Sequence, residues 1–182
     1  MAVLAEKLLV QKFFSLDTET TGIDPITAEL VGMSFSFAEN QAFYVPVPAN
    51  REEALTIVNI FKPAFENPDS LKIGQNIKYD LIMLANYGVT LKGKMFDTMI
   101  AHYVLQPELR HGMDYLAEIY LKYETIKIEE LIGAKGKKQG NMRDLAPEAV
   151  YKYACEDADV TLKLKQVLEN ELETNGVKKL FE

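Results

Sequence analysis

The sequence predicts one α/β domain, built on a mixed five-stranded sheet flanked by helices. Short β-type apolar runs follow one another early in the chain, and later runs alternate with helical patterns. The resulting order is strand, strand, strand, helix, strand, helix, strand, helix, which is typical of an α/β domain. The length of 182 residues, with 48% hydrophobic and 26% charged residues, fits a single domain with a substantial core.

The first predicted strand carries the first candidate site. The apolar run Phe13–Leu16 leads into Asp17 and Glu19, just before turn residues that include Gly22. Side chains two positions apart on a strand share a face, so these carboxylates repel each other unless a positive group lies between them. A divalent cation with oxygen ligands is the first candidate for that group. This segment alone leaves open the alternative of two solvated carboxylates on an exposed strand end.

The remaining elements follow from the apolar runs and the residues that interrupt them. Leu30–Phe37 and Ala42–Val47 predict a hairpin, which makes the first three strands antiparallel neighbours. Asn50 is a candidate cap for the next helix, in which a bend or break is expected near Pro63. The later elements are a strand at Leu71–Gln75, a helix that Asn76 caps and Gly88 ends, a strand at Lys94–Phe96, helices at Thr98–Leu105 and Met113–Tyr120, a long polar loop, and a helix from Pro147 to about Glu173.

Four further candidate residues are expected on helices or at their ends. Asp80 falls in the first turns of its helix, where the helix dipole alone favours an acidic side chain. Asp97 is interpreted as the N-cap of the helix that starts at Thr98. Tyr153 and Asp157 are four residues apart in the last helix and therefore share one face. Each feature is common on ordinary helices, so none of them is decisive alone.

The charge of the chain limits how it can bind nucleic acid. The formal net charge of −7 argues against a general basic nucleic-acid binder. Lys135, Lys137 and Lys138 alternate with glycines and predict a basic loop. This loop is either a solvated linker or a flap that contacts phosphates without reading sequence.

The single cysteine and the N-terminal residues indicate the cellular compartment in which the protein is expected. One cysteine, Cys155, excludes an internal disulfide and fits a reducing cytoplasm. Residues 1–11 are predicted to be a structured element and not a signal peptide, because Glu6 and Lys7 interrupt their apolar stretch. No membrane-spanning segment is expected, and a monomer is the default expectation.

Taken together, the motifs resemble one family. DTET at a strand end, GQNIKYD opening a helix, FDTM after the next strand, RHGMDYLAEIYL, and YACEDADVTL in the last helix are similar to the proofreading 3′→5′ exonuclease domain of bacterial DNA polymerase I. That domain belongs to the exonucleases with four acidic residues and a tyrosine. The resemblance runs from about Phe13 to Leu164 and implies a ribonuclease H-like fold.

The resemblance assigns roles to individual positions. It implies that Asp17, Glu19 and Asp157 hold one divalent ion, Mg²⁺ or Mn²⁺, and that Asp17 and, more loosely, Asp80 hold a second. Tyr153 would stay protonated and orient the attacking water. The positions that would bind or steady the 3′-terminal nucleotide are Thr20, Asn76 and Ile23, the last in place of a leucine wedged against the terminal base.

The resemblance also implies an activity and its partners. The expected reaction is hydrolysis of 3′-terminal phosphodiester bonds of DNA to 5′-mononucleotides, as proofreading in replication and repair. The expected partners are a single-stranded or frayed 3′ end and the polymerase part of the same parent chain, from which residues 1–182 would be an excised exonuclease domain. The alternatives are a free-standing RNA exonuclease related to ribonuclease D and a non-catalytic scaffold that has lost metal ligands.

Overall fold

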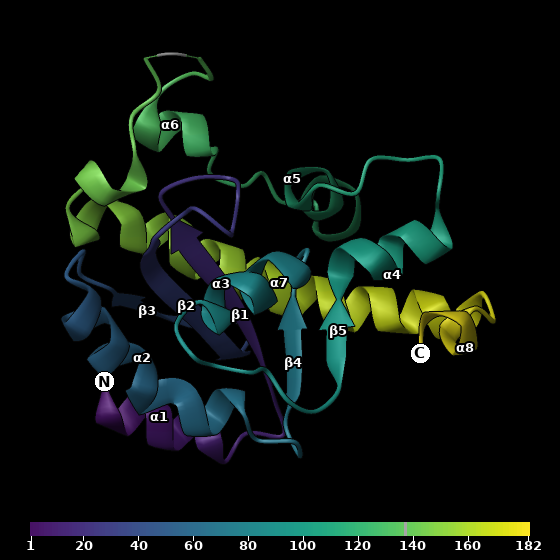
Figure 1. The fold of residues 1–182 in the computed structure, drawn as a ribbon. Helices are drawn as coiled ribbons and strands as arrows, with labels where there is room; N and C mark the ends of the chain where they lie inside the picture. Colours follow the sequence, from purple (N-terminus) through teal and green to yellow (C-terminus); the bar gives the residue numbers. More distant parts are fainter. Residues whose placement is uncertain (137) are drawn as a thin grey trace.

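The computed structural model describes residues 1–136 and 138–182, so Lys137 of the predicted basic loop lies outside the described residues. Its centre is a five-stranded sheet with the order β3-β2-β1-β4-β5 (Figure 1). The first three strands are antiparallel neighbours, whereas β4 and β5 run parallel to β1, so the predicted mixed sheet is confirmed. The strands are β1 (Phe13–Thr20), β2 (Leu30–Ala38), β3 (Gln41–Pro46), β4 (Leu71–Gly74) and β5 (Met95–Asp97).

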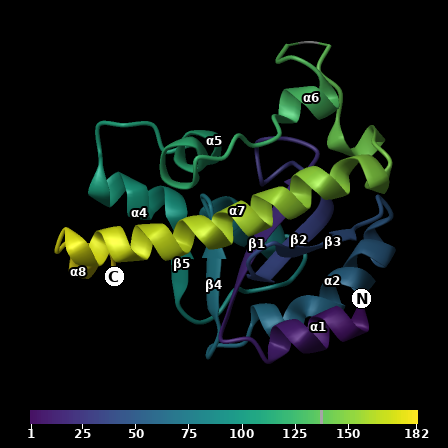
Figure 2. The same cartoon turned by 180° about the vertical axis from the view of Figure 1, so that it is seen from behind.

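Helices cover both faces of this sheet. The helices α1 (Ala2–Leu9) and α2 (Arg51–Phe65) form one core with β1, β2 and β3. The long helix α7 (Pro147–Thr174) crosses the opposite face, as the two views in Figures 1 and 2 show. The other helical segments are α3 (Lys78–Ala85), α4 (Thr98–Leu105), α5 (Met113–Leu116), the π-helical turn η1 (Ala117–Leu121), α6 (Ile128–Ile132), the 3₁₀ turn η2 (Met142–Asp144) and α8 (Lys178–Phe181).

The alternation along β1 decides which side chains meet α7. Phe14 and Leu16 are buried in the core shared with α1 and α2. Ser15 points the other way, and its hydroxyl donates a 2.6 Å hydrogen bond to the carbonyl of Ala158 on α7. Because side chains alternate along a strand, the odd-numbered residues that follow Ser15 lie on the α7 side of the sheet.

Two expectations concern helix ends, and of these the cap at Asn76 is wrong, whereas α2 does end close to Pro63. The chain remains helical through Pro63, and α2 ends at Phe65. Pro63 lies in the last turn, so only the carbonyl of the exposed residue Asn59 loses its helical partner. Asn76 does not cap α3, because its backbone has a left-handed φ of 59° and the helix begins at Lys78.

The long polar loop before α7 is more structured than expected, since it contains α6 and η2. The helix predicted at Met113–Tyr120 is present as α5 and its π-helical continuation η1, and α8 was not anticipated. Within residues 1–136 and 138–182, no helix is both long and apolar enough to span a membrane.

Candidate active site

Three carboxylates converge where β1 meets α7. Asp17 and Glu19 lie on the face of β1 that α7 covers, and Asp157 lies on α7 itself. One carboxylate oxygen from each residue lies within 4.8 Å of the other two. Glu19 and Asp157 are buried, whereas Asp17 is half-buried. The close approach of these two elements, fixed in part by the Ser15–Ala158 hydrogen bond, therefore brings three like charges together.

Asp80 joins this group from α3. Its side chain is buried and lines the same cavity as Asp17, Glu19 and Asp157. The hydroxyl of Thr18, which lies between the two acids of β1, donates a 2.6 Å hydrogen bond to Asp80 Oδ1. That bond fixes the Asp80 carboxylate relative to β1 and leaves its other oxygen for a further partner.

The remaining predicted site residues line one cavity of about 540 Å³ with the four acids. Tyr153 lies one helical turn before Asp157 on α7, as their spacing predicted. Thr20 ends β1, and Ile23 lies in the following loop with a side chain that is 98% exposed. Asn76 enters the cavity from the turn between β4 and α3. The structure thus brings together all eight residues that the sequence placed in the site.

Sequence reasoning missed several other residues that line this cavity. The Tyr79 hydroxyl lies 2.6 Å from Thr20 Oγ1 and donates to the carbonyl of Gly22, so it links α3 to the loop after β1. Its position directly before Asp80 in GQNIKYD was the available signal. Ile128 reaches the cavity from α6, where no pattern predicted a helix, whereas Lys135, which also lines the cavity, belongs to the basic loop that the sequence did predict.

Burial raises the pKa of every carboxyl group in the cluster, and repulsion from neighbouring acids adds to it for Glu19, Asp80 and Asp157. Burial raises the pKa of Asp17 to about 6. Burial, followed by the charges of Asp17, Asp157 and Asp80, raises the pKa of Glu19 well above its ordinary value. Burial and then the Asp17 charge raise the pKa of Asp80 and of Asp157, although a hydrogen bond from a neighbouring hydroxyl lowers each in part. The cluster therefore carries more negative charge than the protein around it stabilises.

Burial and the same carboxylate charges also shift the pKa of Tyr153. Burial, and then the charges of Asp157, Glu19 and Asp17, raise the pKa of its phenol above the ordinary value. The phenol therefore keeps its proton at neutral pH and can donate a hydrogen bond in the cavity.

The donor set fits a hard divalent cation. Among the described residues, Glu19 Oε1 is buried without a hydrogen-bond partner, and it belongs to the group whose oxygens lie within 4.8 Å of one another. Carboxylate oxygens are the ligands that Mg²⁺ and Mn²⁺ prefer in proteins. A divalent ion would both pair with Glu19 and offset the repulsion among the acids.

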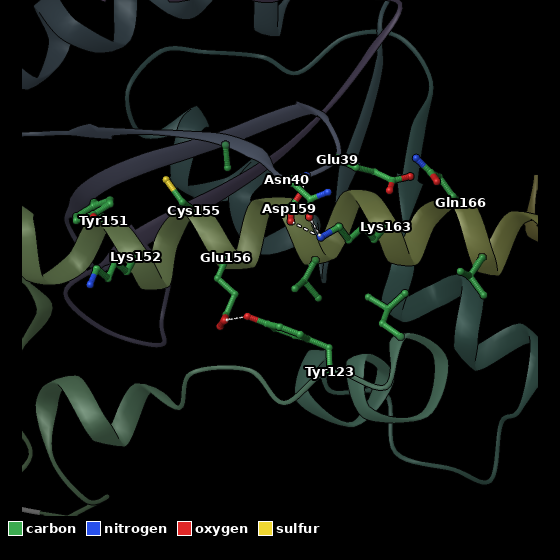
Figure 3. Close-up of a pocket in the computed structure, with 14 residues that line it drawn as sticks. Glu39, Asn40, Tyr123, Tyr151, Lys152, Cys155, Glu156, Asp159, Lys163 and Gln166 are labelled. Carbon is green, nitrogen blue, oxygen red and sulfur yellow. Dashed lines mark hydrogen bonds and ion pairs between the residues drawn. The ribbon is translucent and has the colours of Figure 1, made fainter.

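A second cavity, of about 750 Å³, lies on the outer side of α7 and differs in its electrostatics (Figure 3). There, Glu156 accepts a 2.6 Å hydrogen bond from the hydroxyl of Tyr123. Asp159 accepts a 2.6 Å bond from Lys163 and a 2.7 Å bond from the backbone N–H of Asn40. Because these acids already have partners, the smaller cavity with its repelling carboxylates is the candidate active site.

A cavity of four acids and a tyrosine, at the end of a mixed sheet, defines the class of carboxylate-lined nucleases. Comparisons with known proteins narrow this class. A family model described as "3'-5' exonuclease" matches residues 1–173. The chain belongs to this 3′-5′ exonuclease family, as its motifs predicted.

Relatives and solved structures agree with that assignment. DNA polymerase I of Pseudomonas aeruginosa is 42% identical over 178 residues, which are 92% of this chain and 19% of that protein. The chain thus spans about a fifth of the length of the curated relatives it matches (19% for the first two).

Two solved structures show the same fold. Brucella melitensis NrnC has a TM-score of 0.75 at 24% identity, covering 94% of this chain and 79% of that one. Other structures of NrnC have bound Mg²⁺ or pGG. Escherichia coli RNase D, described as an exoribonuclease involved in structured RNA processing, has a TM-score of 0.69 at 20% identity, covering 96% of this chain and 43% of that one. These likenesses confirm the predicted ribonuclease H-like fold.

Proposed function

We propose that this chain removes nucleotides from the 3′ end of DNA as 5′-mononucleotides, acting as the editing domain of a longer DNA polymerase I-like protein. One observation carries the proposal. Three segments far apart in the sequence deliver Asp17, Glu19, Asp80, Asp157 and Tyr153 to a single cavity, where among the described residues no Lys or Arg forms an ion pair with the acids and Lys135 pairs with Glu129 instead. The 42% identity to a DNA polymerase I favours DNA as the substrate.

The acids would hold the ions that such hydrolysis requires. Asp17, Glu19 and Asp157 would hold one divalent ion, and Asp17 with Asp80 a second, each being Mg²⁺ or Mn²⁺ as in the Mg²⁺-bound structure of NrnC. Bound there, the ions would lower the pKa of a water and stabilise charge on the departing 3′ oxygen. Thr18 keeps Asp80 oriented for this task through its 2.6 Å hydrogen bond.

The other cavity residues would handle water and substrate. Tyr153, which keeps its proton, would orient the attacking water by hydrogen bonding and would not act as a general base. Ile23, 98% exposed at the cavity edge, would pack against the terminal base. Thr20 and Asn76, which line the same cavity, would contact the terminal nucleotide through their polar groups.

DNA affinity would come mainly from outside this chain. With a net charge of −7, the isolated domain should bind DNA weakly and with a shallow salt dependence. The polymerase part of the parent protein is the proposed partner that supplies the remaining affinity and the 3′ end. DNA editing and the single Cys155 favour the cytoplasm as the compartment.

Digestion of matched 5′-labelled DNA and RNA single strands tests the proposal. The reactions contain Mg²⁺, Mn²⁺ or EDTA, with the Asp17→Ala variant and, as a control, Asp69→Asn on the exposed loop between α2 and β4. We expect a metal-dependent ladder that shortens DNA from its 3′ end, is weaker on RNA, is absent in Asp17→Ala and is unchanged in Asp69→Asn. A preference for RNA would favour an RNase D-like enzyme, and an intact substrate at high protein concentration would favour a non-catalytic scaffold.

A further inference from the structure

Asp97 has more partners than a helix cap requires. Its buried carboxylate accepts hydrogen bonds from the backbone N–H groups of Met99 (2.9 Å) and Ile100 (3.3 Å), which confirms it as the N-cap of α4. It also accepts bonds from the N–H groups of Asn76 (3.0 Å) and Ile77 (2.9 Å), in the turn before α3. An N-cap ordinarily serves one helix, so the second pair of bonds needs a separate explanation.

The residue after Asp97 reinforces the same connection. Thr98 is fully buried, and its hydroxyl donates to the carbonyl of Gly74 (3.2 Å) and to the side-chain oxygen of Gln75. Gln75 in turn donates to the carbonyl of His111 (2.7 Å). The corner between β5 and α4 therefore holds each of the four residues from Gly74 to Ile77, next to the parallel pairing of β4 with β5 (Figure 1).

The turn at residues 74–77 has a backbone geometry that is uncommon without supporting contacts. Asn76 has a φ of 59°, a left-handed conformation that is uncommon for residues other than glycine, although asparagine tolerates it better than most. The first helical N–H groups of α3 receive no side-chain cap from Ile77. Asp80, three residues after Ile77, lies in the first turn of α3, so the direction of this turn determines where its carboxylate lies.

We propose that Asp97, assisted by Thr98, is a positioning residue for the exonuclease reaction: its carboxylate fixes the turn that presents Asn76 and Asp80 to the catalytic cavity. The inference rests on the proposed function for its catalytic consequence, whereas the hydrogen bonds that carry it can be tested without any reaction. Asp97 itself does not touch the substrate in this scheme. Its effect passes through the backbone of Asn76 and Ile77.

The substitution Asp97→Asn separates positioning from capping. Oδ1 receives the bonds from Asn76, Met99 and Ile100, whereas Oδ2 receives only the bond from Ile77. An asparagine keeps an oxygen in the first position and is as good an N-cap as aspartate. In the second position it places an NH₂ group against the N–H of Ile77, so two donors meet. A residue that only caps α4 would tolerate this change.

The matched control is Asn50→Asp, the reverse exchange at the N-cap of α2. Asn50 Oδ1 accepts from the N–H groups of Glu52 (3.0 Å) and Glu53 (3.1 Å), and the side chain does not line the catalytic cavity. The first readout is amide hydrogen exchange followed by NMR. In Asp97→Asn we expect exchange at Ile77, whose acceptor Oδ2 is lost, to become at least about tenfold faster, while Asn76, Met99 and Ile100, which bond to the retained Oδ1, keep their protection.

The second readout is kinetics on single-stranded DNA. We expect kcat to fall about 10- to 100-fold in Asp97→Asn, with a melting temperature close to that of the wild type, because a displacement of about 1 Å is enough for such a loss. Asn50→Asp should leave kcat unchanged. Unchanged exchange at Ile77, or unchanged kcat despite faster exchange there, would overturn the positioning role. A wild-type chain inactive on both DNA and RNA refutes the proposed function and with it the catalytic consequence, while the exchange data still decide whether Asp97 fixes the turn.

A second variant covers the case in which Asp97→Asn does not fold. Thr98→Val is nearly isosteric and removes only the hydroxyl that bonds Gly74 and Gln75. Faster exchange at Asn76 together with a lower kcat would support the role of this corner. Wild-type exchange and kcat in Thr98→Val would contradict it.

Discussion

Replacing Asp17 with asparagine should stabilise the metal-free protein. Burial raises the pKa of Asp17 to about 6 from an ordinary 3.8, a difference of about 2 units. At about 1.4 kcal/mol per unit, the ionised carboxylate lowers the free energy of unfolding by up to about 3 kcal/mol at pH 7. The folded state binds the proton more tightly than the unfolded state, so this loss is absent below pH 4 and develops as the pH rises to about 6. Asp17→Asn should therefore raise the melting temperature at pH 7 by up to about 10 °C.

Mg²⁺ should largely remove this difference in stability between wild type and Asp17→Asn. A ligand at a hundredfold excess over its Kd stabilises the folded state by about 2.7 kcal/mol. Wild type should gain this stability, whereas Asp17→Asn, which lacks a carboxylate of the cluster, should gain little. The assay is thermal melting from pH 4 to pH 8 in EDTA and in Mg²⁺, with Asp69→Asn as a control for removing one surface charge. A lower melting temperature for Asp17→Asn in EDTA at pH 7, or equal Mg²⁺ stabilisation of both proteins, would refute the idea that the acids repel one another and share an ion.

Three further predictions address other parts of the molecule. Tyr153→Phe should lower kcat on DNA about 100-fold without lowering the melting temperature, because it removes only a buried hydroxyl among acids; steady-state kinetics and a melt of the same sample check this. Lys135→Ala should raise KM and reduce the slope of log KM against log salt by about one, because Lys135 lines the cavity with an exposed side chain; equal slopes would assign the loop to a solvated linker. Lys72 is fully buried on β4, and burial lowers its pKa to about 8 from 10.5, so wild-type stability should rise between pH 8 and pH 10.5. Lys72→Met should flatten that rise in denaturant titrations and stabilise the protein at pH 7 by up to about 3 kcal/mol, less the loss of the Lys72 bonds to the carbonyls of Asn67 and Ser70.

The sequence predicted those parts of the fold that depend on local pattern. Alternation along β1 placed Asp17 and Glu19 on one face, and the four-residue spacing placed Tyr153 and Asp157 on one face of α7. The two faces meet because β1 packs against α7, and no local pattern predicts that packing. Only the resemblance to a family predicted that these residues share one site.

The elements that were predicted wrongly or missed likewise leave no local pattern in the sequence. Asn76 has the composition of a helix cap, but the group that binds its backbone N–H is the carboxylate of Asp97, which is 21 positions along the chain. Asparagine tolerates the left-handed φ found here, but the hydrogen bond to Asp97 is a tertiary contact that no local pattern reveals. The short helices α6 and α8 are likewise too short to leave a periodic signal, since each covers little more than one turn.

Neighbouring acids on α7 show why charge runs in a sequence do not identify a site. Glu156 is paired with Tyr123, and Asp159 with Lys163, on the side that faces the second cavity (Figure 3). Asp157, between them in sequence, is rotated toward β1 and meets Asp17 and Glu19. Successive side chains on an α-helix point in directions about 100° apart. The same run of acids therefore supplies both a stabilised surface network and a repelling cluster. Which acid can bind a cation is therefore decided by the sheet that α7 covers.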